Sequence, residues 1–78
     1  MGGESHNRKK TAIRKAFGLK VRLRRYELEL TQEELAEKAE LHPTYVGSVE
    51  RGERNIALEN IIALSKALSC SPKDLMPE

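Results

Sequence analysis

The chain has few of the residues from which a disulfide, a metal site or a membrane span is built. Cys70 is the one cysteine, so no disulfide can form within the chain. His6, His42 and Cys70 lack the spacing of metal ligands, so we expect no metal site and no cofactor. No apolar run approaches the ~20 residues that cross a bilayer, and the polar start is unlike a signal peptide. These absences predict a soluble, cytoplasmic protein without a membrane partner.

The sequence also lacks the patterns that would indicate an enzyme. It has no glycine-rich phosphate loop, and 78 residues are too few to close a pocket around paired carboxylates. A chain of this length forms one small domain, which on folding buries only roughly 60% of the surface that the unfolded chain exposes. We therefore expect no catalytic residue and no small-molecule ligand, and a fold that depends on tight helix packing or on a partner subunit.

Charge is unevenly divided along the chain, although the net charge is only +2. Residues 1–30 hold nine Lys or Arg against three Glu, whereas residues 31–78 hold five basic against nine acidic residues. The first part therefore carries +6 and the second −4. This asymmetry favours a polyanionic partner approached from one side, although a small charge-rich domain can also be lopsided by chance.

The first part of the pattern predicts a polar arm followed by two helices. Residues 1–11 are polar, basic at their end and without periodicity, which indicates a flexible basic arm. From Ala12 to about Leu28, apolar residues recur at helical spacing among many basic ones. Thr31 and Glu34 then form a capping-box sequence, because each side chain can bond the backbone amide of the other. The helix that this box opens has an inner face of Leu35, Ala36 and Ala39.

Three more helices follow, and no strand signal of any strength appears. Pro43 suits the first position of a helix that stops near Gly52 and has an inner face of Val46 and Val49. A fourth helix is predicted over about residues 58–68, with Leu58 and Leu64 inside, and a short last turn begins at Pro72. The sequence therefore predicts an all-α, compact five-helix domain over residues 12–78.

The second and third helices are joined by a tight turn, which is the outline of a helix-turn-helix. The small Ala36 lets these helices approach closely, and Leu41 closes the core beneath the turn. The N-terminal half of the third helix contributes little to the core. It contains Pro43, Thr44, Tyr45, Gly47 and Ser48. A helix presented in this way fits the major groove of B-DNA and reads base edges with its first turns.

Residues 17–75 resemble the phage repressor and Cro type of helix-turn-helix domain, the XRE-like family. The resemblance is carried by the strings Thr31-Gln32-Glu33-Glu34-Leu35-Ala36 and Val49-Glu50-Arg51-Gly52-Glu53-Arg54-Asn55. The segment from Leu41 to Gly52 is in addition similar to the controller proteins of restriction–modification systems. The resemblance implies a repressor-like fold and a sequence-specific regulator of transcription that binds double-stranded DNA.

The resemblance also implies roles for residues at the matching positions. Base edges would be read by the start of the third helix, at Pro43, Thr44, Tyr45, Gly47 and Ser48. Phosphates would be held by polar side chains on either side of it, at Gln32, Arg51, Arg54 and Asn55. Arg25 and Glu50 match a family ion pair that ties the first helix to the third. Breaking such a buried pair costs on the order of 3–5 kcal/mol.

Simpler interpretations exist for the residues assigned to DNA. Thr44 and Ser48 could be ordinary surface hydroxyls, and Tyr45 could simply pack against the turn. Arg51 and Arg54 could merely interact favourably with the negative end of the helix dipole.

Other residues are also open to two interpretations. Gln32 could be only a helix former, and the basic segment 8–10 could enter a minor groove or remain a solvated end. We expect His42 to cap a helix and Cys70 to be a small buried apolar residue.

The sequence departs from the family at several positions. Glu29 and Glu40 stand at helix exits where relatives usually have glycine. Either a left-handed glutamate there costs of order 1 kcal/mol against glycine, or the helix ends differently. Pro43 replaces an arginine that is common in controller proteins, so a guanine-reading group is missing. Arg24 occupies a position that is often apolar. The operator sequence therefore does not follow from the resemblance.

One domain of this kind reaches one half-site, so two half-sites about a helical turn apart require a two-fold homodimer. The last two helices carry more apolar residues than one small core needs. We predict a dimer interface formed by Ile61, Ile62, Leu68, Leu75 and Met76, the alternative being packing within the chain.

RNA polymerase and a toxin are two further candidate partners. RNA polymerase is a candidate partner for an activator, through an otherwise solvated acidic face formed by Glu33, Glu37 or Glu40. A different class of function is an antitoxin, which would sequester a toxin and repress its own operon. The chain leaves little beyond the DNA-binding fold for a toxin-binding surface. This favours a stand-alone regulator, which could be autoregulatory.

Overall fold

The computed structural model describes residues 2–78, with side chains from Lys10 onward, and the described residues form helices and loops without a strand. The helices are α1 (Gly2–Glu27), α2 (Gln32–Ala39), α3 (Pro43–Glu50), α4 (Leu58–Ala67) and α5 (Pro72–Leu75). Their order and their approximate bounds from α2 onward confirm the all-α, five-helix domain predicted from the sequence.

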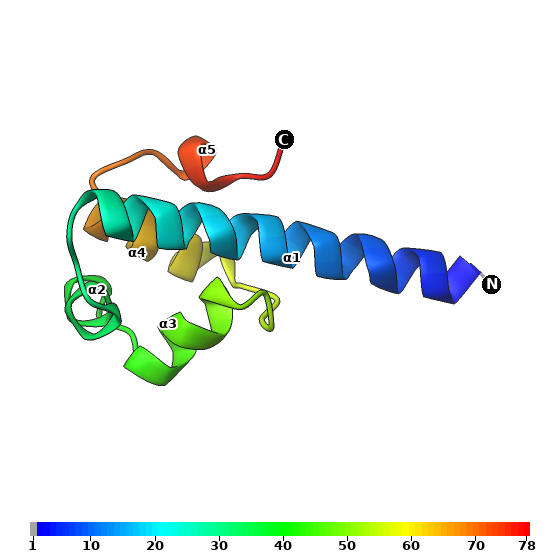
Figure 1. Ribbon diagram of the computed structural model, residues 1–78, viewed down its shortest axis with the longest axis horizontal. Coiled ribbons are helices and arrows are strands. Elements are labelled where there is room, and N and C mark those ends of the chain that lie inside the picture. Colours follow the sequence, from blue (N-terminus) through cyan, green and yellow to red (C-terminus); the bar gives the residue numbers. More distant parts are fainter. Residues whose placement is uncertain (1) are drawn as a thin grey trace.

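Helix α1 runs the length of the molecule, and the other helices pack along one part of it (Figure 1). Helices α2 and α3 lie on one side of α1, and the short α5 lies on the other. Contacts join α1 to α3 and α5, α2 to α3 and α4, and α4 to α5. Helix α3 therefore rests on α1 and α2 with its remaining side turned away from the rest of the chain.

Helix α1 begins earlier than the sequence predicts. The predicted flexible arm ended at Thr11, whereas the structure continues the helix back to Gly2. Extending a helix that already exists adds a hydrogen bond for each residue fixed and needs no new nucleus, and residues 4–11 contain no glycine or proline. The side chains of Arg8 and Lys9, which the sequence assigned to the arm, lie outside the described residues.

The core is formed where one face of each helix meets the others. Its members are Phe17, Val21, Leu35, Ala36, Ala39, Val46, Val49, Leu64, Leu68 and Leu75. The predicted inner faces of α2 and α3 are confirmed. Leu68 and Leu75 are wrong as dimer contacts, because they are 0% and 1% exposed and fill the core of their own chain.

Specific side chains fix the helix ends. The capping box of α2 is confirmed, because the Glu34 amide donates to Thr31 Oγ1 (3.0 Å) and the Thr31 amide donates to Glu34 Oε1 (2.8 Å). His42 caps α3, where its Nδ1 accepts from the Thr44 amide at 3.1 Å. Glu29 and Glu40 have φ values of 56° and 57°, so of the two alternatives for these helix exits the structure shows the left-handed one.

The closest approach between helices lies where α1 crosses the end of α3. A Cβ atom placed on Gly18 would lie 2.2 Å from the carbonyl oxygen of Val49 and 2.7 Å from that of Glu50. Only glycine therefore allows α1 to reach the backbone of α3 at this crossing. This contact determines how α3 stands on the domain.

Candidate nucleic-acid interface

The N-terminal half of α3 is accessible at its first two positions. Pro43 and Thr44 are exposed, and Tyr45 is half-buried. The opposite face of the helix carries Val46 and Val49 into the core. Helix α3 is thus held from behind while its leading end remains open to a partner.

Ser48 is not the exposed base reader that the sequence predicted. Its side chain is 4% exposed, and its hydroxyl donates to the Tyr45 carbonyl (2.7 Å) and accepts from Arg54 Nε (2.9 Å). The helical period places Ser48 on the flank of α3, where the chain that follows the helix folds back over it. Its polar group is fully used in holding Arg54.

Gly47 is also buried, beneath flexible side chains. A Cβ atom at this position would lie 3.2 Å from Arg51 Nη1 and 3.4 Å from Gln32 Oε1. These two side chains, both assigned to phosphates by the sequence, therefore cover the middle of α3. They can be displaced, unlike the backbone atoms that surround Gly18.

Tyr45 and Arg54 form one polar cluster beside the open end of α3. The Arg54 guanidinium lies over the Tyr45 ring, 5.5 Å from its centroid, which is a cation–π distance. The Tyr45 hydroxyl accepts from Asn60 Nδ2 of α4 at 3.1 Å. Tyr45 therefore contacts other parts of the chain and still borders the exposed Thr44. Sequence reasoning missed Asn60, because nothing in its spacing connects it with α3.

The Glu50 carboxylate is a hub of hydrogen bonds at the end of α3, behind the exposed residues Pro43 and Thr44. It accepts from Arg25 Nε (2.6 Å) and Nη2 (2.9 Å), from Gln32 Nε2 (3.0 Å) and from Arg22 Nε (3.3 Å). The predicted pair with Arg25 is confirmed, whereas the bonds from Arg22 and Gln32 were not predicted. Helices α1, α2 and α3 are thereby tied to one buried carboxylate.

The hub also determines the charge state of Glu50. Burial by itself raises the pKa of this carboxyl group, but the hydrogen bonds from Arg25, Gln32 and Arg22 and the charge of Arg25 outweigh burial and hold the pKa below its ordinary value. Glu50 therefore remains ionised, and its carboxylate orients the Gln32 amide beside α3 through one hydrogen bond.

Arg51, Arg54 and Asn55 follow α3 and are exposed, as their predicted contact with phosphates requires. Arg51 is paired with Glu53, with 3.0 Å between Arg51 Nε and Glu53 Oε2 and 3.1 Å between Arg51 Nη2 and Glu53 Oε1. This pairing lowers the pKa of Glu53. Three exposed polar side chains therefore follow the trailing end of α3, and one of them, Arg54, reaches back to Tyr45.

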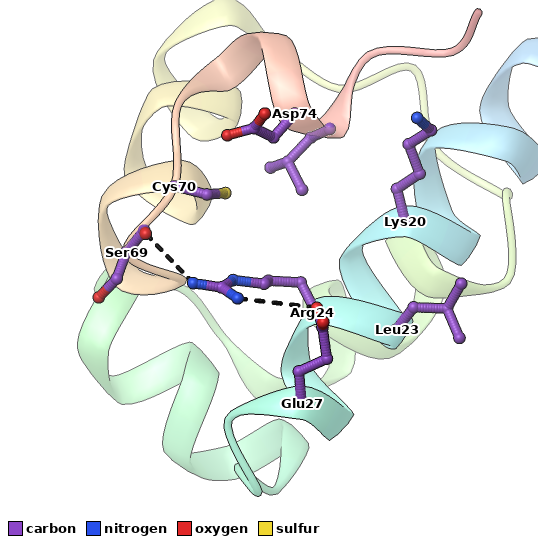
Figure 2. A pocket seen from close by; sticks show the side chains of 8 residues that line it. Lys20, Leu23, Arg24, Glu27, Ser69, Cys70 and Asp74 are labelled. Carbon is purple, nitrogen blue, oxygen red and sulfur yellow. Dashed lines mark hydrogen bonds and ion pairs between the residues drawn. The ribbon is translucent and has the colours of Figure 1, made fainter.

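A hollow lies between α1 and α5, away from α3. Its volume is about 490 Å³, and Figure 2 shows Arg24 reaching across it between Glu27 and Ser69. Arg24 donates to the carbonyls of Leu68 (3.0 Å) and Ser69 (3.3 Å) at the end of α4. Arg24 thus caps α4 from α1, which explains a cation at a position that is often apolar.

Other candidate sites remain without support in the described residues. In that part of the chain, no three His, Cys, Asp or Glu side chains gather as metal ligands do. No helix there has the length and apolar character to cross a membrane. Cys70 is half-buried beside the hollow, and burial raises the pKa of its thiol, as suits a small packed side chain.

The exposed apolar side chains of α4 and of the C-terminal segment differ from the predicted set. Ile62 and Met76 are 39% and 37% exposed, and Ile61 is half-buried. Leu58, which the sequence placed inside, is 69% exposed. Leu58 and Ile62 are four residues apart on one helix and therefore lie on the same face.

Known proteins share both the sequence and the shape of this domain. A family model described as "Helix-turn-helix" matches residues 20–75. Control protein C.BamHI of Bacillus amyloliquefaciens is 49% identical over 65 residues, which are 82% of this chain and 80% of that protein. Control protein C.SmaI of Serratia marcescens is 55% identical over 47 residues, which are 60% of this chain and 56% of that protein.

Two solved structures extend the likeness to three dimensions. The restriction–modification controller protein C.AhdI from Aeromonas hydrophila has a TM-score of 0.82 and 43% identity, over 83% of this chain and 98% of that one. The P22 c2 repressor in complex with a synthetic operator has a TM-score of 0.73 and 37% identity, over 77% and 91%. These relatives are regulators rather than enzymes. The chain therefore belongs to the helix-turn-helix family, on the branch of the restriction–modification controller proteins, and is a DNA-binding regulator of transcription.

Proposed function

We propose that this chain binds a two-part operator as a homodimer, with α3 of each copy in the major groove, and regulates its own operon as a cytoplasmic controller protein. The observation that carries the proposal is the open leading end of α3, with Pro43 and Thr44 exposed and a row of polar side chains on each side. An α-helix fits the major groove, where each base pair presents a distinct pattern of donors and acceptors.

Base reading is assigned to the first turn of α3. Thr44 is exposed and offers a hydroxyl that can donate or accept, and Pro43 offers an apolar ring to a thymine methyl group. Tyr45 borders this turn with its hydroxyl, whereas Gly47 has no side chain and lets the backbone of α3 approach a base edge once Arg51 and Gln32 have moved.

Phosphate binding is assigned to the residues that flank α3. Gln32 opens α2 on one side, and Arg51, Arg54 and Asn55 follow α3 on the other. Phosphate contacts set the register of a protein on the duplex but carry no sequence information. Two such groups on opposite sides would keep α3 centred between the two backbones of the groove.

A homodimer is supported by the apolar face of α4. Leu58 and Ile62 present an exposed pair, and the half-buried Ile61 and the exposed Met76 line a hollow with Ile13 of α1. The proposed interface therefore keeps Ile61, Ile62 and Met76 from the sequence prediction. It omits the buried Leu68 and Leu75 and adds Leu58. A two-fold pair would present two α3 helices about one turn of DNA apart.

Control of transcription would also require a contact with RNA polymerase if the chain activates. Glu33, Glu37 and Glu40 are exposed along α2 and its exit, and they form an acidic face next to α3. A protein docked on DNA by α3 could present this face to the polymerase. The controller proteins among the relatives favour autoregulation, since their names describe control within restriction–modification systems.

Selection of binding sites from random duplex DNA tests the proposal, because it returns both the sequence and the spacing of the half-sites. We expect two half-sites related by a dyad. Thr44→Ala should cost ~1–3 kcal/mol at one base position, whereas Arg54→Ala should weaken binding to all sequences alike and reduce the salt slope by about one. Equal effects of both variants on selected and random DNA would refute these roles, and failure to enrich any sequence would refute the operator.

A further inference from the structure

Arg51 lies on the DNA-facing surface with one edge already occupied. Its Nε and Nη2 atoms face the two oxygens of Glu53 at 3.0 and 3.1 Å, which is a two-point contact. Its remaining nitrogen, Nη1, lies over Gly47 in the middle of α3. The guanidinium therefore extends from the loop after α3 to the surface that would enter the groove.

A carboxylate and a phosphate offer a guanidinium the same pair of acceptor oxygens. A DNA phosphate that approaches Arg51 along its Nε edge therefore meets a position that the Glu53 carboxylate already fills. We propose that Glu53 is an internal substitute for a DNA phosphate, which competes with the duplex for Arg51 and so lowers the affinity that comes from phosphates alone. This role presupposes the DNA-binding mode proposed above, and it adds Glu53 to the residues that determine selectivity.

The exposure of the pair makes such competition reversible. The side chains of Arg51 and Glu53 are 52% and 56% exposed, and exposed pairs of this kind are weak enough to exchange partners. Random DNA offers only phosphate contacts, so pairing of Arg51 with Glu53 removes one of the few contacts that determine its affinity. An operator also offers base contacts at Thr44 and Tyr45, which Glu53 does not block.

The ion pair accounts for the low pKa of the Glu53 carboxyl group, whose largest cause is the hydrogen bond from Arg51, with the charges of Arg51 and Arg54 adding to it. The Arg54 guanidinium is engaged elsewhere, because its Nε donates to Ser48 and it lies over the Tyr45 ring. The competition is therefore assigned to Arg51 rather than to Arg54.

Glu53→Gln tests the competition with random duplex DNA as the probe, titrated at several salt concentrations. We expect binding about two- to five-fold tighter at low salt and a salt slope steeper by about 0.9, the value for one additional phosphate. Glu33→Gln removes the same charge from the exposed start of α2 and should have a smaller effect on the slope. Weaker binding by Glu53→Gln would mean that Glu53 orients Arg51 for DNA and would overturn the proposal.

A double-mutant cycle separates competition at Arg51 from a general loss of negative charge. In an Arg51→Gln background, Glu53→Gln should no longer tighten binding, because the contested guanidinium is gone. A full effect in that background would overturn the proposal. Wild-type chain that binds no duplex at all would instead refute the proposed function.

A measurement without DNA tests the contact itself. Carboxyl NMR titration of the free protein should show that Arg51→Gln raises the pKa of Glu53, because its main hydrogen bond is removed. An unchanged pKa would show that the pair does not form in solution and would overturn the inference, whatever the outcome for DNA binding.

Discussion

At the scale of single residues, Glu50 is the side chain on which the proposed DNA-facing surface most depends. Its carboxylate is fully buried and accepts hydrogen bonds from Arg25, Arg22 and Gln32. The sequence predicted the Arg25 partner from the family resemblance. It could not predict the other two, because their approach depends on how α1 and α2 cross, which is set by the packing of the whole core.

Glu50→Gln should destabilise the fold strongly, because it leaves the buried Arg25 guanidinium without an opposite charge. We expect a loss on the order of 3–5 kcal/mol. Urea unfolding measures the change, and Glu53→Gln provides the control, since it removes an exposed carboxylate whose ion pair is screened by solvent and should change stability little. Similar small losses in both variants would contradict the importance of the hub.

The same hub predicts how stability varies with pH. The pKa of Glu50 is lower in the folded than in the unfolded state, so the unfolded state binds this proton first as the pH falls. The contribution of Glu50 is therefore complete above the unfolded pKa of about 4.3 and is lost as the pH falls through the folded value. Unfolding measured from pH 7 to pH 3 should show this loss, and the curve of Glu50→Gln should be flatter there.

Glu40 offers a change in the opposite direction. It ends α2 with a φ of 57°, where glycine has no steric penalty. Glu40→Gly should therefore stabilise the fold by about 0.5–1 kcal/mol, and thermal unfolding measures the gain. Glu37→Gly is the matched control within α2, and it should destabilise by roughly 0.5–1 kcal/mol because its backbone is helical. A loss at Glu40 would show that its side chain contributes more than its backbone strain costs.

At the scale of helices, local signals predicted α2 and α3 well. The capping box at Thr31, the proline at position 43 and the small Ala36 are all short-range features, and each lies where the sequence placed it. The crossing of α1 and α3 was not predicted, because a glycine within a helical pattern does not say which backbone it touches. The burial of Ser48 was missed for a related reason, since helical spacing does not say that the loop directly after α3 folds back over this side chain.

Gly18→Ala tests the crossing of α1 and α3. The added methyl group would meet carbonyl oxygens that cannot move without shifting α3. Overpacking of this kind costs about 1–3 kcal/mol or more, which chemical denaturation measures. Gly47→Ala is the control, because its methyl group meets only the flexible ends of Arg51 and Gln32 and gains helix propensity. It should leave stability unchanged or improved while weakening DNA binding.

At the scale of the whole molecule, the sequence predicted the number of helices and most of the core but not which apolar residues are exposed. Leu68 and Leu75 were assigned to an interface and lie in the core, whereas Leu58 was assigned to the core and is exposed. Hydrophobic periodicity reports that a face is covered. It does not distinguish cover by the same chain from cover by a second copy.

The proposed dimer is tested by light scattering coupled to gel filtration. Wild-type chain at micromolar concentration should have twice the mass of the monomer, and Ile62→Glu should shift it to the monomer by placing a charge in the apolar face of α4. Leu19→Glu is the control, because Leu19 is 51% exposed on α1 and is not part of the proposed interface. A monomeric wild type, or an equal shift by both variants, would refute this interface.

The crossing at Gly18 has a consequence for the duplex itself. The trailing end of α3 sits on the backbone of α1, and the buried Glu50 carboxylate locks it there, so the helix has no freedom to tilt into a poorly fitting groove. In the proposed two-fold complex, adjustment would come from bending or twisting of the base pairs between the half-sites. The ease of that deformation depends on sequence, so the protein would discriminate among operators at steps that none of its side chains touches.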